Sequence, residues 1–303
     1  MSVKLKKLAD QVIVVTGASS GIGLATAEAA AKLGAKVVLA ARSEKTLNDI
    51  AGRIAAAGGQ AIAVACDVSD RKQVDAVARA ALARFGRIDT WVNGAGVGIY
   101  GRLEECEESD SRRLFDVNFW GVVHGCLAAL PHLKRDGGAL ITVASEVSDA
   151  YPPLLGIYTA TKHALKGYID VLRVETEDVE KAPVSITLIQ PTAVDTPFPQ
   201  HSRNYMSQEP KLPTPMIEPQ AVADAILDAA VRPTRDKRVG TLAKVSTTMS
   251  MLFPSLVDTM AAKQVGRMQY DESPRNPAGA LYQSSQAIGV AGQTHGTGGR
   301  EPK

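Results

Sequence analysis

Six short runs of mainly apolar residues alternate with segments of helical periodicity along the first two thirds of the chain. The runs cover residues 11–16, 35–40, 60–65, 87–93, 138–144 and 184–190. Runs that stay apolar at successive positions are typical of strands buried on both faces of a parallel sheet. Strands joined through helices in this way form right-handed crossovers. The sequence therefore predicts an α/β fold with a doubly wound sheet covered by helices on both faces.

The regular alternation stops well before the end of the chain. Residues 197–218 contain five prolines and little periodicity, which predicts a long loop or lid. Pro219 suits the first turn of a new helix. We therefore expect one main domain over residues 8–245, which includes the 197–218 lid, and a helical extension over 246–282. Gly, Ser and Gln dominate residues 283–303, and this composition predicts disorder.

Composition narrows the class of partner. The chain of 303 residues carries a formal charge of +2 at pH 7, so a small molecule is a better expectation than nucleic acid. No apolar run approaches the ~20 residues of a membrane-spanning helix, and the N-terminus lacks the apolar core of a signal peptide. Cys66, Cys106 and Cys126 form neither a CxxC pair nor a cluster with histidine, so we expect no disulfide and no metal site. These features predict a cytoplasmic protein.

A glycine-rich turn, TGASSGIG over residues 16–23, follows the first predicted strand directly, and helical periodicity begins at once. Gly17, Gly21 and Gly23 let the backbone turn tightly and approach a pyrophosphate, which the free N–H groups of a helix N-terminus favour. The alternative is a turn that merely packs a helix on a strand. The strand before and the helix after match the context of dinucleotide binding, which we therefore predict.

The end of the second predicted strand indicates which dinucleotide binds. An acidic residue there bonds the ribose 2′-hydroxyl of NAD, whereas an arginine accommodates the 2′-phosphate of NADP. This chain has Arg42 and Ser43 at that place and no acid. Arg42 offers a planar fork of donors to a phosphate, and Ser43 offers another donor. The sequence predicts NADP(H) as the cofactor; a solvated loop arginine is the alternative.

Tyr158 and Lys162 lie four residues apart in the helical run GIYTATKHALKG. Side chains at i and i+4 share one face of a helix, so the phenol and the ammonium would be neighbours. Such pairs also arise by chance on solvated helices, and one pair alone indicates little. Its meaning depends on what else the chain contains.

Six motifs in one order carry a resemblance to a known family. They are TGASSGIG, CDV at 66–68, NGAG at 93–96, Asn118 in DVNFWG, Ser145 after the fifth predicted strand, and Tyr158 with Lys162 thirteen and seventeen residues later. Together they resemble the short-chain dehydrogenase/reductase family over roughly residues 8–245. The resemblance implies a Rossmann fold with a mostly parallel seven-stranded sheet. It also implies an NADP(H)-dependent oxidoreductase that interconverts a ketone or aldehyde and an alcohol.

The resemblance implies catalytic roles for four residues. Tyr158 would protonate a carbonyl oxygen while NADPH delivers hydride, or act as the base in the reverse direction. A free phenol titrates near ~10, and Lys162 would lower the pKa of Tyr158 electrostatically and bond the nicotinamide ribose. Ser145 would polarise the substrate carbonyl, and Asn118 would hold a water that links Lys162 to solvent.

Cofactor contacts follow from the same resemblance, with Asp67 and Val68 flanking the adenine and Thr196 near the carboxamide. The expected cofactor residues are Gly17, Ser19, Ser20, Gly21, Ile22, Gly23, Arg42, Ser43, Asp67, Val68, Asn93, Gly94, Ala95, Gly96, Tyr158, Lys162, Pro191, Val194 and Thr196. The chain departs from the family at Gly94, where a second Asn is usual, and at Thr192, where Gly is usual. We expect the first change to loosen the sheet locally and the second to alter how the next loop packs on the nicotinamide.

Substrate and assembly are less sharply defined. Residues 146–155 and the 197–218 lid should form the pocket, and YPPLL within it predicts apolar walls and a hydrophobic ketone or alcohol. The helices around Asn118 and Lys162 resemble those through which the family assembles, so we expect a homodimer or homotetramer. Two alternatives stay open: a non-catalytic dinucleotide sensor or scaffold, and a membrane-associated lipid reductase with residues 245–262 on the bilayer.

Overall fold

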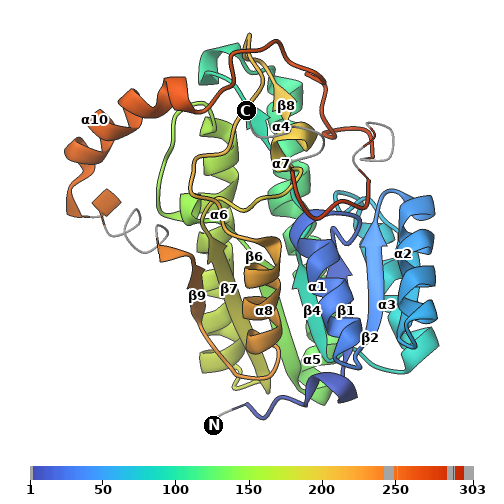
Figure 1. The fold of residues 1–303 in the computed structure, drawn as a ribbon. Helices are drawn as coiled ribbons and strands as arrows, with labels where there is room; N and C mark the ends of the chain where they lie inside the picture. The colour runs from blue at the N-terminus through green and yellow to red at the C-terminus, as the bar shows by residue number, and fades with distance from the viewer. Residues whose placement is uncertain (1–2, 242–248, 251, 285–288, 290, 297–303) are drawn as a thin grey trace.

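The computed structural model describes residues 3–241, 249–250, 252–284, 289 and 291–296. Its centre is a seven-stranded sheet with helices on both faces (Figure 1). The strands are β1 (Val12–Thr16), β2 (Lys36–Ala41), β3 (Gln60–Ala65), β4 (Thr90–Asn93), β6 (Gly138–Val143), β7 (Val184–Pro191) and β9 (Asp236–Val239). Their order is β3-β2-β1-β4-β6-β7-β9, and every neighbouring pair is parallel. The predicted doubly wound Rossmann fold is confirmed.

The apolar runs of the sequence mark the strands that are buried in the sheet. All residues of β1, β6 and β7 are buried, so these strands need apolar side chains on both faces. β9 has the sequence DKRV and no apolar run, because it lies at the edge of the sheet, where its residues are only partly covered. The order reverses between β1 and β4, and ligands of such sheets bind in the crevice beyond the strand ends at this point.

The helices divide between the two faces of the sheet. One core joins α1 (Gly21–Lys32), α2 (Glu44–Ala56) and α8 (Pro219–Ala229) to the face that carries Ile13 and Val15. The other joins α3 (Arg71–Phe85), α5 (Gly121–Asp136) and α6 (Gly156–Arg173) to the face that carries Val12 and Val14. Successive side chains of β1 thus enter opposite cores, as the period of a strand requires.

Shorter elements connect these layers. α4 (Glu108–Phe115) continues through a π-helical turn (Asp116–Trp120) into α5, and a second π-helical turn (Val174–Val179) follows α6. One-turn 3-10 helices cover Leu8–Asp10, Leu103–Glu105, Glu146–Ser148 and Val265–Arg267. The helical stretch Glu108–Asp136 has the length and composition of a membrane span, but 61% of its apolar window is buried inside the fold. It packs as a core helix of the domain.

The lid and the carboxy-terminal extension lie beyond the carboxyl ends of the strands (Figure 1). Within the lid, α7 (Phe198–His201) precedes β8 (Arg203–Asn204), which pairs with β5 (Ile99–Tyr100). α10 (Pro254–Gln264) projects from the body, and the chain then returns across β8 towards α1 and α2. Parts of the predicted extension (246–248 and 251) and of the predicted disordered tail (285–288, 290 and 297–303) fall outside the described residues.

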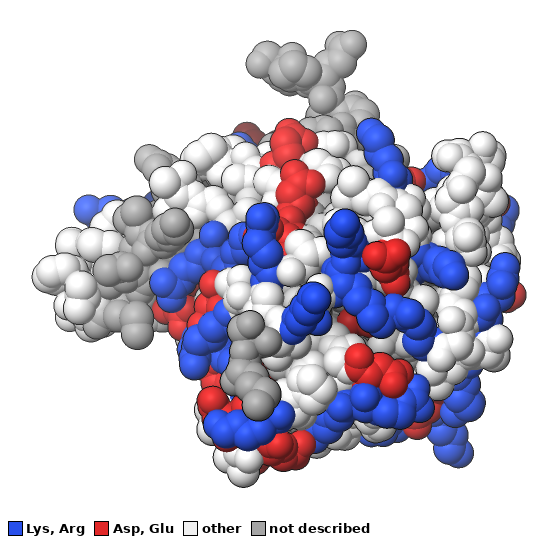
Figure 2. Space-filling view, turned by 90° about the horizontal axis from the view of Figure 1, so that it is seen from below, with Lys and Arg blue, Asp and Glu red and all other residues white. Residues whose placement is uncertain are grey.

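The opposite end of the molecule carries charges of both signs. Figure 2 shows Lys and Arg interspersed with Asp and Glu on this face. Asp89, whose side chain is almost fully buried, accepts bonds from the Val12 N–H at 2.8 Å and from Lys6 at 2.6 Å, and it also pairs with Arg87. These contacts fix the amino-terminal segment to the start of β1 and β4, far from the lid.

Candidate active site

The three polar side chains implied in proton transfer meet where β6 and α6 approach each other. Ser145 begins the 3-10 turn after β6, and its hydroxyl forms a hydrogen bond with the phenol of Tyr158. Lys162 lies one turn after Tyr158 on α6, with its Nζ 5.6 Å from the centroid of the Tyr158 ring. Lys162 also donates to the carbonyl of Val143 at 3.1 Å. This contact holds the ammonium against β6, beside the ring.

Burial dominates the ionisation of this group. It raises the pKa of Tyr158, although the hydrogen bond from Ser145 acts to lower it, and the charge of Glu146 raises it further. Burial also lowers the pKa of Lys162 to about 8. The pKa of the phenol is therefore raised in the protein alone and not depressed as the sequence suggests, because desolvation outweighs the hydrogen bond from Ser145. The phenol is protonated at neutral pH.

Asn118 organises the backbone around these residues. It lies in the π-helical turn between α4 and α5 and is fully buried. Its side chain bonds both backbone groups of Val97, at 3.0 and 2.9 Å, and donates to the Thr161 hydroxyl at 3.2 Å. Asn118 thus ties the segment after β4 to α6. Its predicted role in holding a water stays a prediction.

The glycine-rich turn packs closely on the end of β4. Gly17 has a φ of +74°, and a Cβ atom there would lie 2.7 Å from the Cα of Ala95. Only glycine fits this position. A Cβ at Gly94 would lie 2.8 Å from the carbonyl oxygen of Thr16. The departure from the family at Gly94 therefore permits a close approach between the two segments. The expected loosening of the sheet stays a prediction.

Asn93 takes a different place from the one the family resemblance implies. Its amide oxygen accepts from the Trp91 indole at 2.8 Å, and its nitrogen lies 3.4 Å from the Thr142 hydroxyl. The side chain is buried between the sheet and α5 and is not among the residues that line the cleft. Thr192, the second departure, donates to Glu146 at 3.1 Å and so ties the end of β7 to the turn after Ser145.

The adenosine end of the site carries a group of charges. Burial alone raises the pKa of Asp67, but hydrogen bonds from Arg113 and Ser69 outweigh it and hold the pKa below its ordinary value. Arg42 donates to the carbonyl oxygens of Ala280 and Leu281 at 2.6 and 3.3 Å. Its guanidinium is therefore held by the carboxy-terminal segment, a contact that no sequence pattern indicates.

One continuous cleft joins these groups. Its volume is about 670 Å³, which lies within the range of ligand sites. All the expected catalytic and cofactor residues line it except Asn93 and Asn118. A dinucleotide therefore fits the residues present: the glycine turn and the N-terminus of α1 at one end, and Tyr158 at the other. In the described part of the chain, no group of three or more His, Cys, Asp or Glu could hold a metal ion.

The substrate end of the cleft is apolar, and part of it comes from residues that the sequence did not assign. The expected segment 146–155 contributes Val147 and Leu155, and the lid contributes Phe198, whose ring lies 5.1 Å from that of Tyr158. α10 adds Val257 and Met260, followed by Met268. The carboxy-terminal extension therefore lines its own subunit's cleft. The amphipathic sequence of this region indicates packing but not its location.

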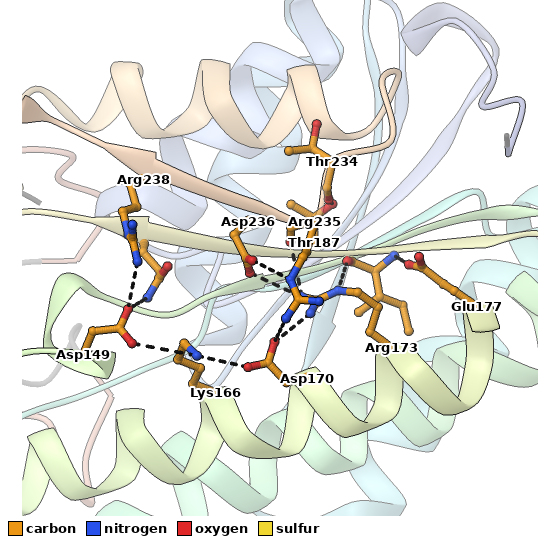
Figure 3. A network of polar contacts seen from close by, with 12 residues as sticks. Asp149, Lys166, Asp170, Arg173, Glu177, Thr187, Thr234, Arg235, Asp236 and Arg238 are labelled. Atoms are coloured by element: carbon orange, nitrogen blue, oxygen red, sulfur yellow. Dashed lines mark hydrogen bonds and ion pairs between the residues drawn. The ribbon is translucent and has the colours of Figure 1, made fainter. Parts of the chain in front are cut away.

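A buried polar network holds α6 and the loop after Ser145 to the sheet edge (Figure 3). Arg173 donates to the carbonyl of Ile186 on β7 at 2.9 Å and pairs with Asp170 at 2.7 Å. Asp149, just after the turn that begins at Ser145, accepts from Gln190 at 2.7 Å and pairs with Arg238 at 3.5 Å. The network therefore fixes both elements that carry the proton-transfer residues.

The geometry agrees with a match to a known family. The family model for short chain dehydrogenases matches residues 11–206. The chain belongs to the short chain dehydrogenase family. An uncharacterized oxidoreductase of Bacillus subtilis, YxnA, is 45% identical over 284 residues, which cover 92% of this chain and 80% of the relative.

Two solved members of the family show how far the likeness extends. An alcohol dehydrogenase from Thermococcus sibiricus, complexed with 5-hydroxy-NADP, is 31% identical with a TM-score of 0.66, covering 76% of this chain and 94% of its own. A short chain dehydrogenase/reductase from Burkholderia phymatum, in complex with NAD, is 29% identical with a TM-score of 0.73, covering 83% and 96%. Members of the family thus bind either nucleotide.

Proposed function

We propose that the protein is an NADP(H)-dependent oxidoreductase that interconverts a hydrophobic ketone or aldehyde and the corresponding alcohol. The observation that carries this proposal is the single cleft with the glycine turn and Arg42 at one end and Ser145, Tyr158 and Lys162 at the other. A protein that only binds a dinucleotide does not need a proton donor and a buried ammonium at the end of that cleft.

Proton transfer is assigned to Tyr158. The bound nicotinamide supplies or accepts the hydride. Because burial keeps the Tyr158 phenol protonated, it is ready to donate its proton to a substrate oxygen in the reductive direction. Ser145 bonds the phenol, so its hydroxyl would polarise the same substrate oxygen. The ammonium of Lys162, 5.6 Å from the ring, stabilises the phenolate that remains after transfer.

The preference for NADP(H) rests on the end of β2. Ala41, Arg42 and Ser43 stand where an NAD site would place a carboxylate, and no acid is present among them. A guanidinium in this position suits a phosphate with its planar array of donors. Arg42 and Ser43 both line the cleft. They support a contact with the 2′-phosphate of the cofactor.

The substrate class follows from the lining of the other end. Leu155, Phe198 and Met268 surround the approach to Tyr158, and α10 adds Val257 and Met260. An apolar wall of this extent favours a substrate with a hydrophobic body, since its burial contributes about 25 cal/mol for each Å² removed from water.

A Tyr158→Phe variant tests the enzyme proposal. Consumption of NADPH would be measured against a panel of hydrophobic ketones and aldehydes, and cofactor binding by calorimetry. We expect kcat to fall by about 10²–10⁴-fold with binding retained. Tyr168→Phe is the matched control, because Tyr168 lies on the same helix and packs on Phe119. Equal turnover by Tyr158→Phe and the wild-type protein would leave the non-catalytic sensor as the better account.

A membrane-associated lipid reductase is the second candidate. The exposed side chains of Leu252, Phe253 and Leu256 favour it. They belong to the same segment as Val257 and Met260, which line the apolar end of the cleft. Sedimentation with phospholipid vesicles separates this candidate from a cytoplasmic enzyme. Recovery of all the protein in the supernatant would remove it.

Assembly into a homodimer or homotetramer is proposed on the outer faces of α5, of the π-helical turn before it, and of α6. Trp120, Leu127 and Val171 are apolar and more than two fifths exposed there. Light scattering would measure the mass in solution. A Trp120→Glu change should reduce it, and a monomeric wild-type protein would refute the proposal.

A further inference from the structure

The carboxy-terminal chain crosses the dinucleotide end of the cleft in two places. We call residues 276–284 the first span and residues 291–296 the second span. Both lie beyond residue 206, where the match to the family model ends. Both contact residues expected to bind the cofactor, although the composition of the tail predicts disorder from residue 283 onward.

The first span is fixed against the lid. The Ala280 N–H donates to the carbonyl of His201 at 2.7 Å. Gly279 has a φ of +58°, and a Cβ atom there would lie 2.3 Å from the carbonyl oxygen of Ser202, so this crossing requires glycine. The side chain of Leu281 is fully buried in the core beneath. The first span is therefore packed as part of the domain.

Carbonyl oxygens of the first span orient Arg42. The guanidinium donates to Ala280 at 2.6 Å and to Leu281 at 3.3 Å. The Leu281 carbonyl also accepts from Arg113 at 3.3 Å, and Arg113 is paired with Asp67. Because a guanidinium has five N–H donors, these two bonds leave three for a phosphate while the fork is held in place.

The second span pairs with the glycine-rich turn. The Gly292 N–H donates to the carbonyl of Ser19, and the Gly21 N–H donates to the carbonyl of Gln293, each at 2.9 Å. This reciprocal pair resembles a short rung of a sheet. It holds the span against the turn that a pyrophosphate is expected to approach.

The other end of the second span is held at the loop that carries Thr196, which lies directly against the glycine turn: a Cβ atom at Gly21 would be 3.3 Å from the Cβ of Thr196. The Gly296 N–H donates to Asp195 at 3.1 Å, and Gln200 donates to the Gly296 carbonyl at 3.1 Å. A Cβ atom at Gly296 would lie 2.4 Å from the carbonyl oxygen of Thr196. The second span is therefore attached both to the glycine turn and to the Thr196 loop beside it, and its close contact with Thr196 requires glycine at position 296.

The cleft stays hollow beneath the spans. The cavity of about 670 Å³ includes the glycine turn, Arg42 and Ser43, together with Ala280 and Ser284 of the first span. A segment that blocked the site would fill this volume. The first span instead forms part of the cavity wall, and the second span lies against Ser19 and Gly21, which line the cavity.

We infer that the two spans are part of the dinucleotide site and retain bound NADP(H) by closing the cleft over the phosphate-bearing half of the cofactor. This inference rests on the proposed function. It extends the cofactor site to residues that no motif of the family contains. Exchange of the cofactor then requires the second span to detach from the glycine turn, so release is slow in the full chain.

The test is the rate at which bound NADPH leaves the full-length protein. NADPH fluorescence would be followed after displacement by excess NADP⁺. Gly296→Val places a side chain against the Thr196 backbone and lifts the second span. Loss of two or three hydrogen bonds should raise the release rate by about tenfold or more. Gly266→Val is the matched control, because nothing lies within 4 Å of a Cβ atom there, and its release rate should equal that of the wild-type protein.

Each outcome decides between accounts. Equal release from Gly296→Val and the wild-type protein would overturn the inference, and so would tighter binding by the variant, which would mean that the span competes with the cofactor. Gly292→Val, at a φ of +74°, gives a second variant with the same expectation. Failure of the wild-type protein to bind any dinucleotide would refute the proposed function itself, whereas binding with unchanged release refutes only this inference.

Discussion

The cleft has two walls that are built in different ways. The inner wall consists of strand ends and the turn after β1, whose residues are set by a fully buried sheet. The outer wall consists of residues 276–284 and 291–296, which are held largely by bonds to backbone groups and to Arg42. Segments with few buried apolar contacts open at lower free energy than core strands. The rigid inner wall can thus position the chemistry, while the second span, which no fully buried side chain among the described residues 291–296 anchors in the hydrophobic core, can detach and so retain or release the ligand.

The largest difference between the walls should appear when glycine is lost from the inner one. Gly17→Val combines a φ of +74° with a contact 2.7 Å from Ala95, and we expect it to abolish dinucleotide binding and to lower the free energy of unfolding by about 3 kcal/mol. Gly86→Val is the control for the dihedral angle alone, with a φ of +79° and open space around it. Calorimetry and urea unfolding would measure both. If both variants lost the same free energy of unfolding, the close contact at Gly17 would contribute nothing and this prediction would be contradicted.

The buried ammonium of the inner wall should cost stability. Burial lowers the pKa of Lys162 from 10.5 to about 8, so the unfolded chain binds more protons than the folded one between these values. The destabilisation of the folded state by the buried ammonium is fully present below pH 8 and disappears as the pH rises towards 10.5. Lys162→Met should therefore raise the free energy of unfolding by about 3 kcal/mol at pH 7 while it reduces turnover.

Urea unfolding at pH 7 and at pH 9.5 checks this prediction. The wild-type protein should gain stability relative to Lys162→Met between the two values. Lys45→Met, which alters an exposed side chain on α2, serves as the control. If Lys162→Met is less stable than the wild-type protein at both pH values, the contacts of the ammonium outweigh the cost of its burial.

The outer wall has one firm attachment to the core. Leu281 is fully buried, and Leu281→Ala should lower the free energy of unfolding by about 2–3 kcal/mol within a single transition. Leu256→Ala on the exposed face of α10 should change it by less than about 0.5 kcal/mol. Chemical denaturation followed by two probes would measure both. If Leu281→Ala leaves the free energy of unfolding unchanged, the first span does not unfold together with the domain.

The smallest effect is expected at the network behind the inner wall. Asp149 joins the turn after Ser145 to Gln190 and Arg238 (Figure 3). Asp149→Asn weakens these charge-assisted bonds, and we expect a loss of about threefold to tenfold in kcat with little change in KM. Steady-state kinetics beside Asp178→Asn, on the turn after α6, would test it. A change confined to KM would place Asp149 in substrate binding instead.

The inner wall follows from local sequence patterns because its physical requirements are local. A buried strand needs apolar residues at successive positions, and β1, β6 and β7 show them. A tight turn between a strand and a helix needs glycine, which Gly17 supplies. β9 escapes prediction because an edge strand needs no such run. The position of the Asn93 side chain depends on a contact across strands, with Thr142 on β6.

The outer wall could not be predicted, because its contacts join residues far apart in the sequence and do not depend on a local pattern. The bonds to Ser19 and Gly21 come from backbone groups of residues 292 and 293, and any residue type carries those groups. Gly296 is required by a contact with Thr196 that lies far away in sequence. In the printed sequence it is one glycine among many, in a composition typical of disorder. Only the three-dimensional structure distinguishes a glycine that a close contact requires from a glycine in a flexible tail.

The central claim is that the cleft binds NADP(H) through Arg42, and calorimetric titration tests it most directly. NADPH and NADH would each be titrated into the wild-type protein and into Arg42→Ala. We predict that the wild-type protein binds NADPH more tightly and that Arg42→Ala loses about 10- to 100-fold in affinity for NADPH, as expected for a charged hydrogen bond. Titration with NADH is the control for loosening of the first span, and the affinity for NADH should fall much less in Arg42→Ala. Preference of the wild-type protein for NADH, or equal losses for both nucleotides, would contradict the claim.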